Sequence, residues 1–254
     1  MVRFRVLQRD VVGEISDWQA LRQYAHDVKA HTLAHLNRYL EQLEQKVEAA
    51  GGIMHWVQDA EEARRLIVQL ATSRGRRVVK SKSMTTEEID LNEALEHAGC
   101  EVTETDLGEY VLQLAGEPPA HLIAPIVHKS KEAISALLSE KLGVPRYDSA
   151  EQLTHVARDA LRRRFLDADV GISGVNFAVA ETGTVVVVEN EGNARLCMTL
   201  PRMHIAVMGI EKVIPRLSDL GAFLTLLPRS ATGQRMSSYV SCITGPRRSG
   251  EADG

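Results

Sequence analysis

The sequence predicts an α/β protein with a mainly parallel central sheet flanked by helices and a long N-terminal helix. Short apolar runs of strand length alternate with amphipathic segments of helix length, which is typical of a parallel sheet covered on both faces. A long helical stripe precedes them. Hydrophobic residues make up 44% and charged residues 25% of the 254 residues, as in globular proteins with a sizeable core.

The N-terminal helix is predicted over residues 17–50, where apolar side chains recur at steps of three and four. Ser16 or Asp17 can cap its start, and Gly51-Gly52 can end it. We therefore expect residues 1–52 to form a helical extension that covers the rest of the domain or contacts a partner.

The α/β domain is predicted over residues 53–245, and residues 246–254 read as a flexible tail. In its first half, predicted strands alternate with predicted helices. These strands are residues 53–57, 76–80, 100–106 and 121–125, and the helices are residues 59–75, 85–99, 107–116 and 130–143. The second half adds helices at 150–168 and 213–227 and strands at 170–180, 184–190, 204–210 and 238–244.

Composition excludes several classes of protein. The net charge of −4 predicts no general attraction to nucleic acid, and the polar N-terminus and short apolar runs predict neither a secretory signal nor a membrane span. We expect a cytoplasmic protein. The three cysteines, Cys100, Cys197 and Cys242, are far apart and predict no metal site built by this chain. Neither a G-x-S-x-G nor a G-x-G-x-x-G motif is present.

Two loops after predicted strands hold candidate ligand-binding residues, because ligands of open parallel sheets bind beyond the carboxyl ends of the strands. In "KSKSM", Lys80, Ser81, Lys82 and Ser83 could bind an anion beside a helix N-terminus. In "TETDLGEY", Thr105 and Asp106 stand at the end of the next strand. The alternative is that these residues only cap helices and that the lysines are solvated.

The third candidate segment is "TGTVVVVENEGN", residues 182–193. Its valines predict a strand buried on both faces, which would hold the following polar residues rigidly. Glu189, Glu191 and Asn193 share one face of an extended chain, and Gly183 and Thr184 precede the strand. Two close carboxylates could supply a base or nucleophile, with Glu191 as the catalytic candidate. The alternative is an ordinary polar exit from a strand.

Several long strings resemble one family. "EVTETDLGEYVLQLAGEPPAHLIAPIVHK", "ADVGISGVNFAVAETGTVVVVENEGNARL", "LPRMHIAVMGIEKVIPRL" and "RSATGQ" are similar, in order over about residues 15–250, to the LUD domain of lactate utilization protein B. The resemblance implies a fold like that of ribose-5-phosphate isomerase and the CoA transferases. It also implies a part in oxidising L-lactate to pyruvate within a multi-subunit iron–sulfur complex, in which other subunits are the partners.

The resemblance also implies two four-iron four-sulfur clusters in a full-length protein, carried by a ferredoxin-like region that this sequence lacks. We expect no cofactor in this chain, which would be either a fragment or a naturally short member. Glu191-Gly192 is similar in setting to the nucleophilic glutamate of CoA transferases of this fold.

Three functions follow from these observations. In the first, the chain is the ligand-binding or subunit-docking domain of a lactate-oxidising complex, binds a small carboxylate or phosphate-like ligand, and is inactive alone because nothing in it accepts electrons. In the second, it is a non-catalytic scaffold. In the third, it is a stand-alone isomerase or acyl-CoA-transfer enzyme that uses Glu191. We rank them in that order.

Overall fold

The predicted α/β class is confirmed by the computed structural model, which describes residues 2–117, 126 and 128–248. Two elements of the second half differ from the prediction: residues 170–180 form two strands that belong to different sheets, and residues 213–214, predicted as the start of a helix, form a strand. Its contacts group the chain into two compact units. Unit 1 takes Met1–Trp56, Val175–Asn190 and Met208–Gly254, and unit 2 takes Val57–Gly174 and Glu191–Val207. The division at residues 52 and 245 expected from the sequence stays a prediction.

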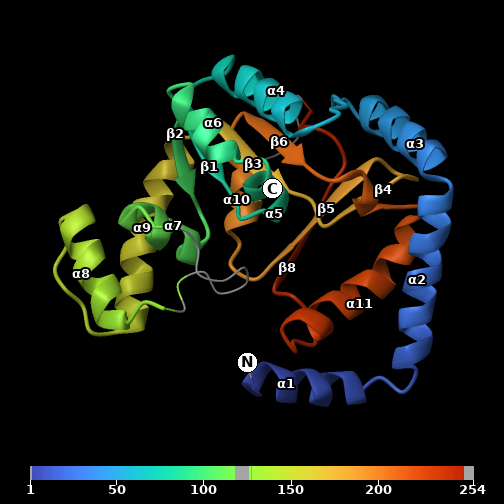
Figure 1. Ribbon diagram of the computed structural model, residues 1–254, viewed down its shortest axis with the longest axis horizontal. Coiled ribbons are helices and arrows are strands. Elements are labelled where there is room, and N and C mark those ends of the chain that lie inside the picture. The colour runs from blue at the N-terminus through green and yellow to red at the C-terminus, as the bar shows by residue number, and fades with distance from the viewer. Residues whose placement is uncertain (1, 118–125, 127, 249–254) are drawn as a thin grey trace. The chain divides into compact units, whose positions relative to one another are not determined.

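Unit 2 contains the parallel sheet that the sequence predicted (Figure 1). Its strands run in the order β2-β1-β3-β6, and every neighbouring pair is parallel. The strands are β1 (Arg77–Lys80), β2 (Glu101–Glu104), β3 (Val170–Gly174) and β6 (Met203–Val207). The helices of unit 2 are α4 (Ala60–Thr72), α5 (Met84–Glu88), α6 (Leu91–His97), α7 (Leu107–Ala115), α8 (Lys131–Leu142), α9 (Ala150–Asp167) and α10 (Asn193–Thr199).

Alternate residues of β1 pack into two different cores, as expected for a strand covered on both faces. Val78 packs with apolar side chains of α4 and α6. Val79 packs with those of α7, α9 and α10. The next two residues, Lys80 and Ser81, continue this alternation, so they leave the end of β1 on opposite faces of the sheet.

Three elements predicted in the first half are not reproduced as single elements by the described residues. Residues 85–99 form two helices, α5 and α6, because the chain takes a positive φ of 48° at Asp90 between them. Residues 53–57 form neither a strand nor a helix, so the predicted strand is wrong. The strand predicted at residues 121–125 lies outside the described residues.

Unit 1 contains a second sheet, which the sequence did not predict as a separate element. Its strands run in the order β7-β4-β5-β8, and only the β4–β7 pair is parallel. They are β4 (Phe177–Val179), β5 (Thr184–Glu189), β7 (Val213–Ile214) and β8 (Tyr239–Ile243). The four valines of β5 form the predicted central strand, but the strands beside it, β4 and β8, run antiparallel to it.

A tight turn joins β4 to β5. Gly183 has a φ of 73°, and a Cβ atom added to it would lie 2.7 Å from the backbone of Lys46 and Val47. A residue with a side chain would be strained by both effects. Glycine is therefore needed here to let the hairpin approach the last turns of α3.

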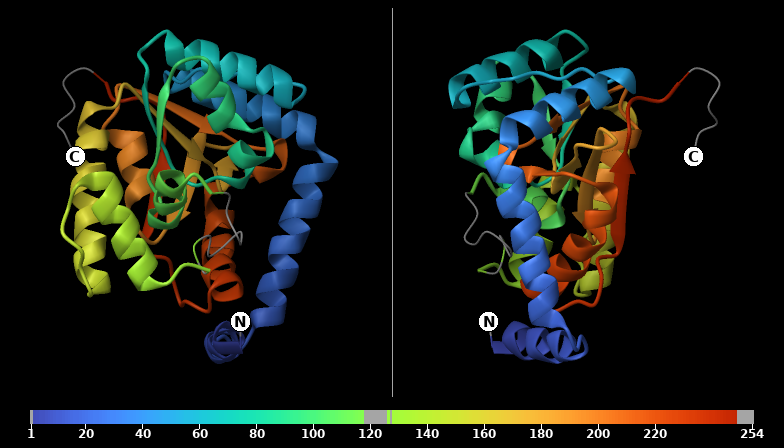
Figure 2. Two further views of the ribbon diagram at one scale, coloured as in Figure 1. Left: turned by 60° about the vertical axis from the view of Figure 1, so that its left-hand side comes forward. Right: turned by 90° about the vertical axis from the view of Figure 1, so that its right-hand side faces the viewer.

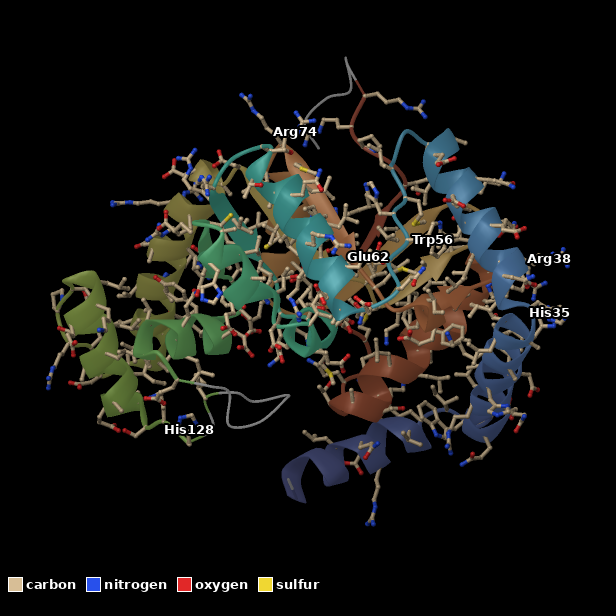
Figure 3. All side chains as sticks on the ribbon, turned by 45° about the horizontal axis from the view of Figure 1, so that its top comes forward. His35, Arg38, Trp56, Glu62, Arg74 and His128 are labelled. Carbon is tan, nitrogen blue, oxygen red and sulfur yellow. The ribbon has the colours of Figure 1, made fainter. Side chains whose placement is uncertain are left out.

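The N-terminal segment is helical, as predicted, but it forms three helices. They are α1 (Val2–Gly13), α2 (Trp18–Ala34) and α3 (Leu36–Ala49). The predicted helix over residues 17–50 is broken at His35, whose φ of −125° is not helical, and α3 leaves α2 at an angle there (Figures 1 and 3). Helix α2 packs against α11 (Leu220–Ala231), and the two lie side by side in Figure 2. Two short 3-10 helices, Ile210–Lys212 and Leu217–Asp219, complete unit 1.

Within the described ranges, no helix is long and apolar enough to cross a membrane.

Candidate functional site

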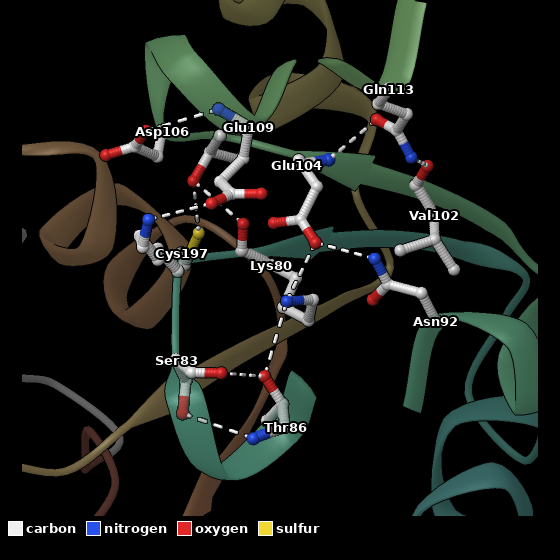
Figure 4. A network of polar contacts seen from close by, with 12 residues as sticks. Lys80, Ser83, Thr86, Asn92, Val102, Glu104, Asp106, Glu109, Gln113 and Cys197 are labelled. Carbon is white, nitrogen blue, oxygen red and sulfur yellow. Dashed lines mark hydrogen bonds and ion pairs between the residues drawn. The ribbon is translucent and has the colours of Figure 1, made fainter. Parts of the chain in front are cut away.

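The carboxyl ends of β1, β2 and β3 bring most of the predicted site residues into one region of unit 2. Seven of the ten candidates belong to this unit: Lys80, Ser81, Ser83, Thr105, Asp106, Glu191 and Asn193. Figure 4 shows the polar network that connects many of them. The network divides between the two faces of the sheet.

On the face of the sheet to which Val78 belongs, Lys80 forms a buried ion pair with Glu104. The Lys80 Nζ atom lies 2.8 Å from Glu104 Oε1, and the two side chains are only 1% and 7% exposed. Lys80 Nζ also donates to the Thr86 hydroxyl at 3.3 Å, and Asn92 Nδ2 donates to Glu104 Oε1 at 2.6 Å (Figure 4). These contacts compensate the removal of both charges from water.

Two buried acceptor atoms of this network have no hydrogen-bond partner among the residues that the structure describes. They are Glu104 Oε2 and Asn92 Oδ1. Gln113 fixes the strand beneath them, since it accepts from the Glu104 backbone N–H at 3.0 Å and donates to the Val102 carbonyl at 2.8 Å. Buried polar atoms are normally satisfied, so these two oxygens can still accept a donor from water or a ligand.

The second lysine of the loop is also paired. Lys82 Nζ lies 2.8 Å from Glu109 Oε1 of α7, and its side chain is 21% exposed. Glu87 of α5 lies in the same electrostatic environment: burial and the charge of Glu109 raise the pKa of its carboxyl group, while Lys80 and Lys82 act in the opposite direction. Both lysines predicted to bind an anion are thus already matched by glutamates.

Ser83 and Asp106 act as helix caps. Ser83 accepts from the Thr86 N–H at 3.4 Å, and a Cβ atom added to Gly174 would lie 2.6 Å from the Ser83 hydroxyl oxygen. Asp106 accepts from the N–H groups of Gly108 and Glu109 at 3.0 and 3.3 Å. This is the capping alternative considered for both residues, and it satisfies donors that would otherwise be available to an anion.

On the opposite face, Thr105 connects β1 to α10. Its hydroxyl donates to the Lys80 carbonyl at 3.0 Å, accepts from Asn193 Nδ2 at 3.2 Å and lies 3.4 Å from Cys197 Sγ. Ser81 leaves β1 on this same face and is 3% exposed. Thr105 and Asn193 are therefore hydrogen-bonded neighbours.

Glu191 lies at the start of α10, and its Oε2 atom accepts from the Leu107 N–H at 3.3 Å. A carboxylate at this position is favourable because Leu107 is the first residue of α7. Gly192, with a φ of 81°, then turns the chain into α10. Glu191 is solvent-exposed, so its carboxylate is accessible to a ligand as well as acting as a cap.

A serine–histidine contact in unit 2 was not predicted. Ser173 Oγ of β3 lies 2.8 Å from His204 Nε2 of β6, and burial lowers the pKa of His204 to about 4. Ser173 is fully buried, so this contact forms part of the sheet interior. Residues 173 and 204 are 31 positions apart, and only the register of β3 with β6 brings them together.

The remaining three candidates belong to unit 1 and do not form one cluster there. Thr184 begins β5, and its hydroxyl lies 2.7 Å from that of Thr182 and 2.6 Å from that of Thr244. Gly183 makes the preceding turn, whereas Glu189 is the last residue of β5 and pairs in register with Tyr239. Gly183 and Thr184 thus lie at the opposite end of the strand from Glu189.

Sequence reasoning missed four residues of the polar network: Glu87, Asn92, Glu104 and Glu109. The strand period gives the face of Glu104, because it follows Val102 by two residues just as Lys80 follows Val78. Pairing Lys80 with Glu104 also requires the register of β1 with β2, which places these two residues opposite each other.

The residues present do not fit an iron–sulfur cluster. The whole sequence has three cysteines, fewer than the four thiolates that hold a four-iron cluster, and Cys100 and Cys197 are buried while Cys242 is exposed. In residues 2–117, 126 and 128–248, no group of three or more histidine, cysteine, aspartate or glutamate side chains is placed to hold a metal ion.

The fold and the site define an α/β protein with a charged polar network at the carboxyl end of a parallel sheet. The model of the LUD domain family matches residues 40–254, and the chain belongs to this family, which confirms the resemblance found in the sequence.

Curated relatives cover almost the whole chain. It is 49% identical over 99% of its length to lactate utilization protein B of Shouchella clausii and 45% identical over 99% to that of Bacillus subtilis. It is 46% identical over 97% to an uncharacterized electron transport protein, YkgF, of Escherichia coli. The chain spans about half the length of these relatives, namely 54%, 53% and 52%. A solved structure, a DUF162 family protein from Deinococcus radiodurans, is 14% identical, with a TM-score of 0.46 over 82% of this chain and 88% of that one.

Proposed function

We propose that this chain is the LUD region of a lactate utilization protein of the B type. In this proposal it takes part in the oxidation of L-lactate to pyruvate within a multi-subunit iron–sulfur complex. The observation that carries the proposal is the identity of 45–49% with lactate utilization proteins B over 99% of the chain.

Within such a complex, the proposed role of this chain is to bind a small carboxylate rather than to carry electrons. Lactate oxidation removes two electrons, and the three cysteines of this chain do not come together as cluster ligands, since Cys100 and Cys197 belong to different core clusters and Cys242 is exposed. The two four-iron four-sulfur clusters of the proposal are therefore held outside this chain, and the electrons go to them or to another subunit.

The proposed binding region is the carboxyl end of the unit 2 sheet. Lys82 is its accessible cation, because its side chain is 21% exposed whereas that of Lys80 is 1% exposed. The exposed carboxylate of Glu191 and the amide of Asn193 lie at the same end of the sheet. This support comes from position and chemistry, since polar groups converge where ligands of parallel sheets bind.

Isothermal titration calorimetry with L-lactate tests the ligand role. We expect L-lactate to bind the chain and D-lactate to bind more weakly, and we expect Lys82→Met to weaken L-lactate binding by about tenfold or more, as for a lost charge-assisted contact. Lys141→Met is the matched control, because Lys141 lies in an exposed pair with Glu140. If L-lactate does not bind, the ligand role is wrong. Binding that Lys82→Met leaves unchanged would place the ligand elsewhere.

A further inference from the structure

A cavity of about 530 Å³ lies at the amino ends of the strands of unit 2, opposite to the carboxyl ends that hold the candidate site. Three arginines from separate segments line it: Arg77 begins β1, Arg202 precedes β6, and Arg74 follows α4 (Figure 3). All of its described lining residues belong to unit 2. Cavities of roughly 300–1,000 Å³ are typical of small-molecule sites, so this one is large enough for a ligand.

Asp169 fixes the guanidinium group of Arg77 at the wall of this cavity. Arg77 Nη2 donates to Asp169 Oδ1 at 2.9 Å, and Arg77 Nε donates to Asp169 Oδ2 at 3.3 Å. The same Oδ2 atom accepts from the backbone N–H groups of Arg76 and Arg77, each at 3.1 Å. A Cβ atom added to Gly75 would lie 2.3 Å from Asp169 Cγ, so glycine leaves room for this carboxylate. Arg77 is thus held in place, and its Nη1 donors are not used by the pair.

The other two arginines of the cavity carry charges that no described side chain balances. Within residues 2–117, 126 and 128–248, the side chains of Arg74 and Arg202 form no ion pair or hydrogen bond. Both are exposed. A single exposed arginine is usually just solvated. Here two of them line one cavity with a third that is already fixed, which gives the cavity several free N–H donors.

The acidic side chains around the cavity do not cancel this positive charge. Asp169 is paired with Arg77, and Glu101, whose charge also acts on Arg77, is paired with Arg164. Asp167 lines the cavity and is exposed to water. The described lining contains three arginines and two aspartates, so its formal charge is +1. A cavity with this charge favours an anion.

The origin of the arginines indicates a phosphate group rather than a single carboxylate. A carboxylate is planar, and one guanidinium fork can satisfy both of its oxygens. The phosphate group of an ester has three oxygens that point in different directions, and it carries about −1.5 to −2 charges at pH 7. It therefore needs donors from several sides, and the three arginines supply them from three segments. Leu166 and Met203 add apolar lining that can contact an organic group.

We propose that this cavity is a binding site for a small phosphate ester, whose phosphate group is held by Arg74, Arg77 and Arg202. Arg77 is oriented in advance by Asp169, and the other two side chains close on the bound phosphate. The exposed carboxylate of Asp167 can accept a hydrogen bond from a hydroxyl group of the ligand. Because the site lies at the opposite ends of the strands from the proposed lactate region, this inference does not depend on lactate binding.

Isothermal titration calorimetry with inorganic pyrophosphate, in the absence of divalent metal ions, tests the site. We expect pyrophosphate to bind the unmodified chain. Arg74→Met and Arg202→Met should each weaken this binding by about tenfold or more, as for a lost charge-assisted contact. Arg158→Met is the matched control and should keep the affinity, because Arg158 is an exposed arginine of α9 that does not line the cavity.

Two comparisons separate this site from other anion sites. Succinate, a dicarboxylate, should bind more weakly than pyrophosphate, because its planar groups use fewer of the donors. Lys82→Met should leave pyrophosphate binding unchanged, because Lys82 follows the carboxyl end of β1. Should the cavity variants not fold, nitrogen-15 NMR of the unmodified chain gives a second measurement. Pyrophosphate should then shift the Nε–H signals of Arg77 and Arg202 and leave that of Arg158 in place.

Each outcome decides the proposal. Loss of affinity in Arg74→Met and Arg202→Met, with affinity kept in Arg158→Met and Lys82→Met, supports it. Absence of pyrophosphate binding to the unmodified chain overturns it, as does binding that the cavity variants leave unchanged or that Lys82→Met abolishes. Succinate binding as tight as that of pyrophosphate, or arginine NMR signals that pyrophosphate does not shift, also overturns the phosphate assignment. All of these results leave the proposed function intact.

Discussion

The buried pair of Lys80 and Glu104 gives the sharpest prediction about stability. Replacing Lys80 with methionine keeps most of the side-chain volume and removes the charge. Glu104 would then keep the donor from Asn92 Nδ2 on one oxygen and have no described partner on the other. Its carboxylate would remain 7% exposed without a counter-charge.

The distance and burial set the size of the effect. At 2.8 Å, two unit charges attract by about 6 kcal/mol with an effective dielectric constant of 20. Part of this attraction only offsets desolvation, and breaking comparable buried pairs costs about 3–5 kcal/mol. We expect Lys80→Met to lower the free energy of unfolding by that amount. Lys80→Met combined with Glu104→Leu should lose only about 1–3 kcal/mol, because no unpaired charge remains and Asn92 alone loses an acceptor.

Urea denaturation followed by far-UV circular dichroism measures these changes. Both tryptophans of the chain, Trp18 and Trp56, belong to unit 1, so tryptophan fluorescence gives a separate signal from that unit. Lys141→Met is the exposed control and should change stability by less than about 0.5 kcal/mol. A loss below about 1 kcal/mol for Lys80→Met, or a double variant as unstable as the sum of the two single variants, would refute the reasoning.

Three further predictions concern other parts of the chain. Gly171→Ala should lose about 3 kcal/mol or more in urea denaturation, because its Cβ would overlap the Cys197 carbonyl, whereas Gly221→Ala, with nothing within 4 Å, should gain up to about 1 kcal/mol; equal effects would contradict this. Burial lowers the pKa of His204 to about 4 from 6.5, so the unfolded chain binds a proton first and stability should fall as pH falls from about 6.5 to about 4. His204→Gln should remove that part of the pH dependence, and an unchanged profile would show that His204 is not its source. The purified metal-free chain should reduce no dye with L-lactate, and lactate-dependent reduction would place an electron acceptor in this chain.

Most strands and helices could be predicted from the local spacing of apolar residues. Strands were predicted at residues 76–80, 100–106 and 184–190, and the structure contains β1, β2 and β5 within these ranges. Period does not report the direction of a neighbouring strand. The second sheet, in which β5 pairs antiparallel with β4 and β8, was therefore missed.

Helix breaks without glycine or proline were missed for a related reason. His35 and Asp90 interrupt patterns that remain helical on both sides, and neither residue type is a strong breaker. Such breaks depend on packing between segments that are distant in sequence. The predicted strand at residues 53–57 shows the opposite case, in which an apolar run forms no regular element.

The candidate site could also be predicted only in part. The sequence predicted the carboxyl end of the sheet and the residues on it, because strand ends and polar loops are local features. It did not predict the glutamates that pair with Lys80 and Lys82. The first pair depends on the register of β1 with β2, and the second depends on where α7 packs. This difference changes the chemistry expected of the loop. Two free lysines would attract any anion, whereas two lysines that each lie 2.8 Å from a glutamate oxygen attract an anion less strongly.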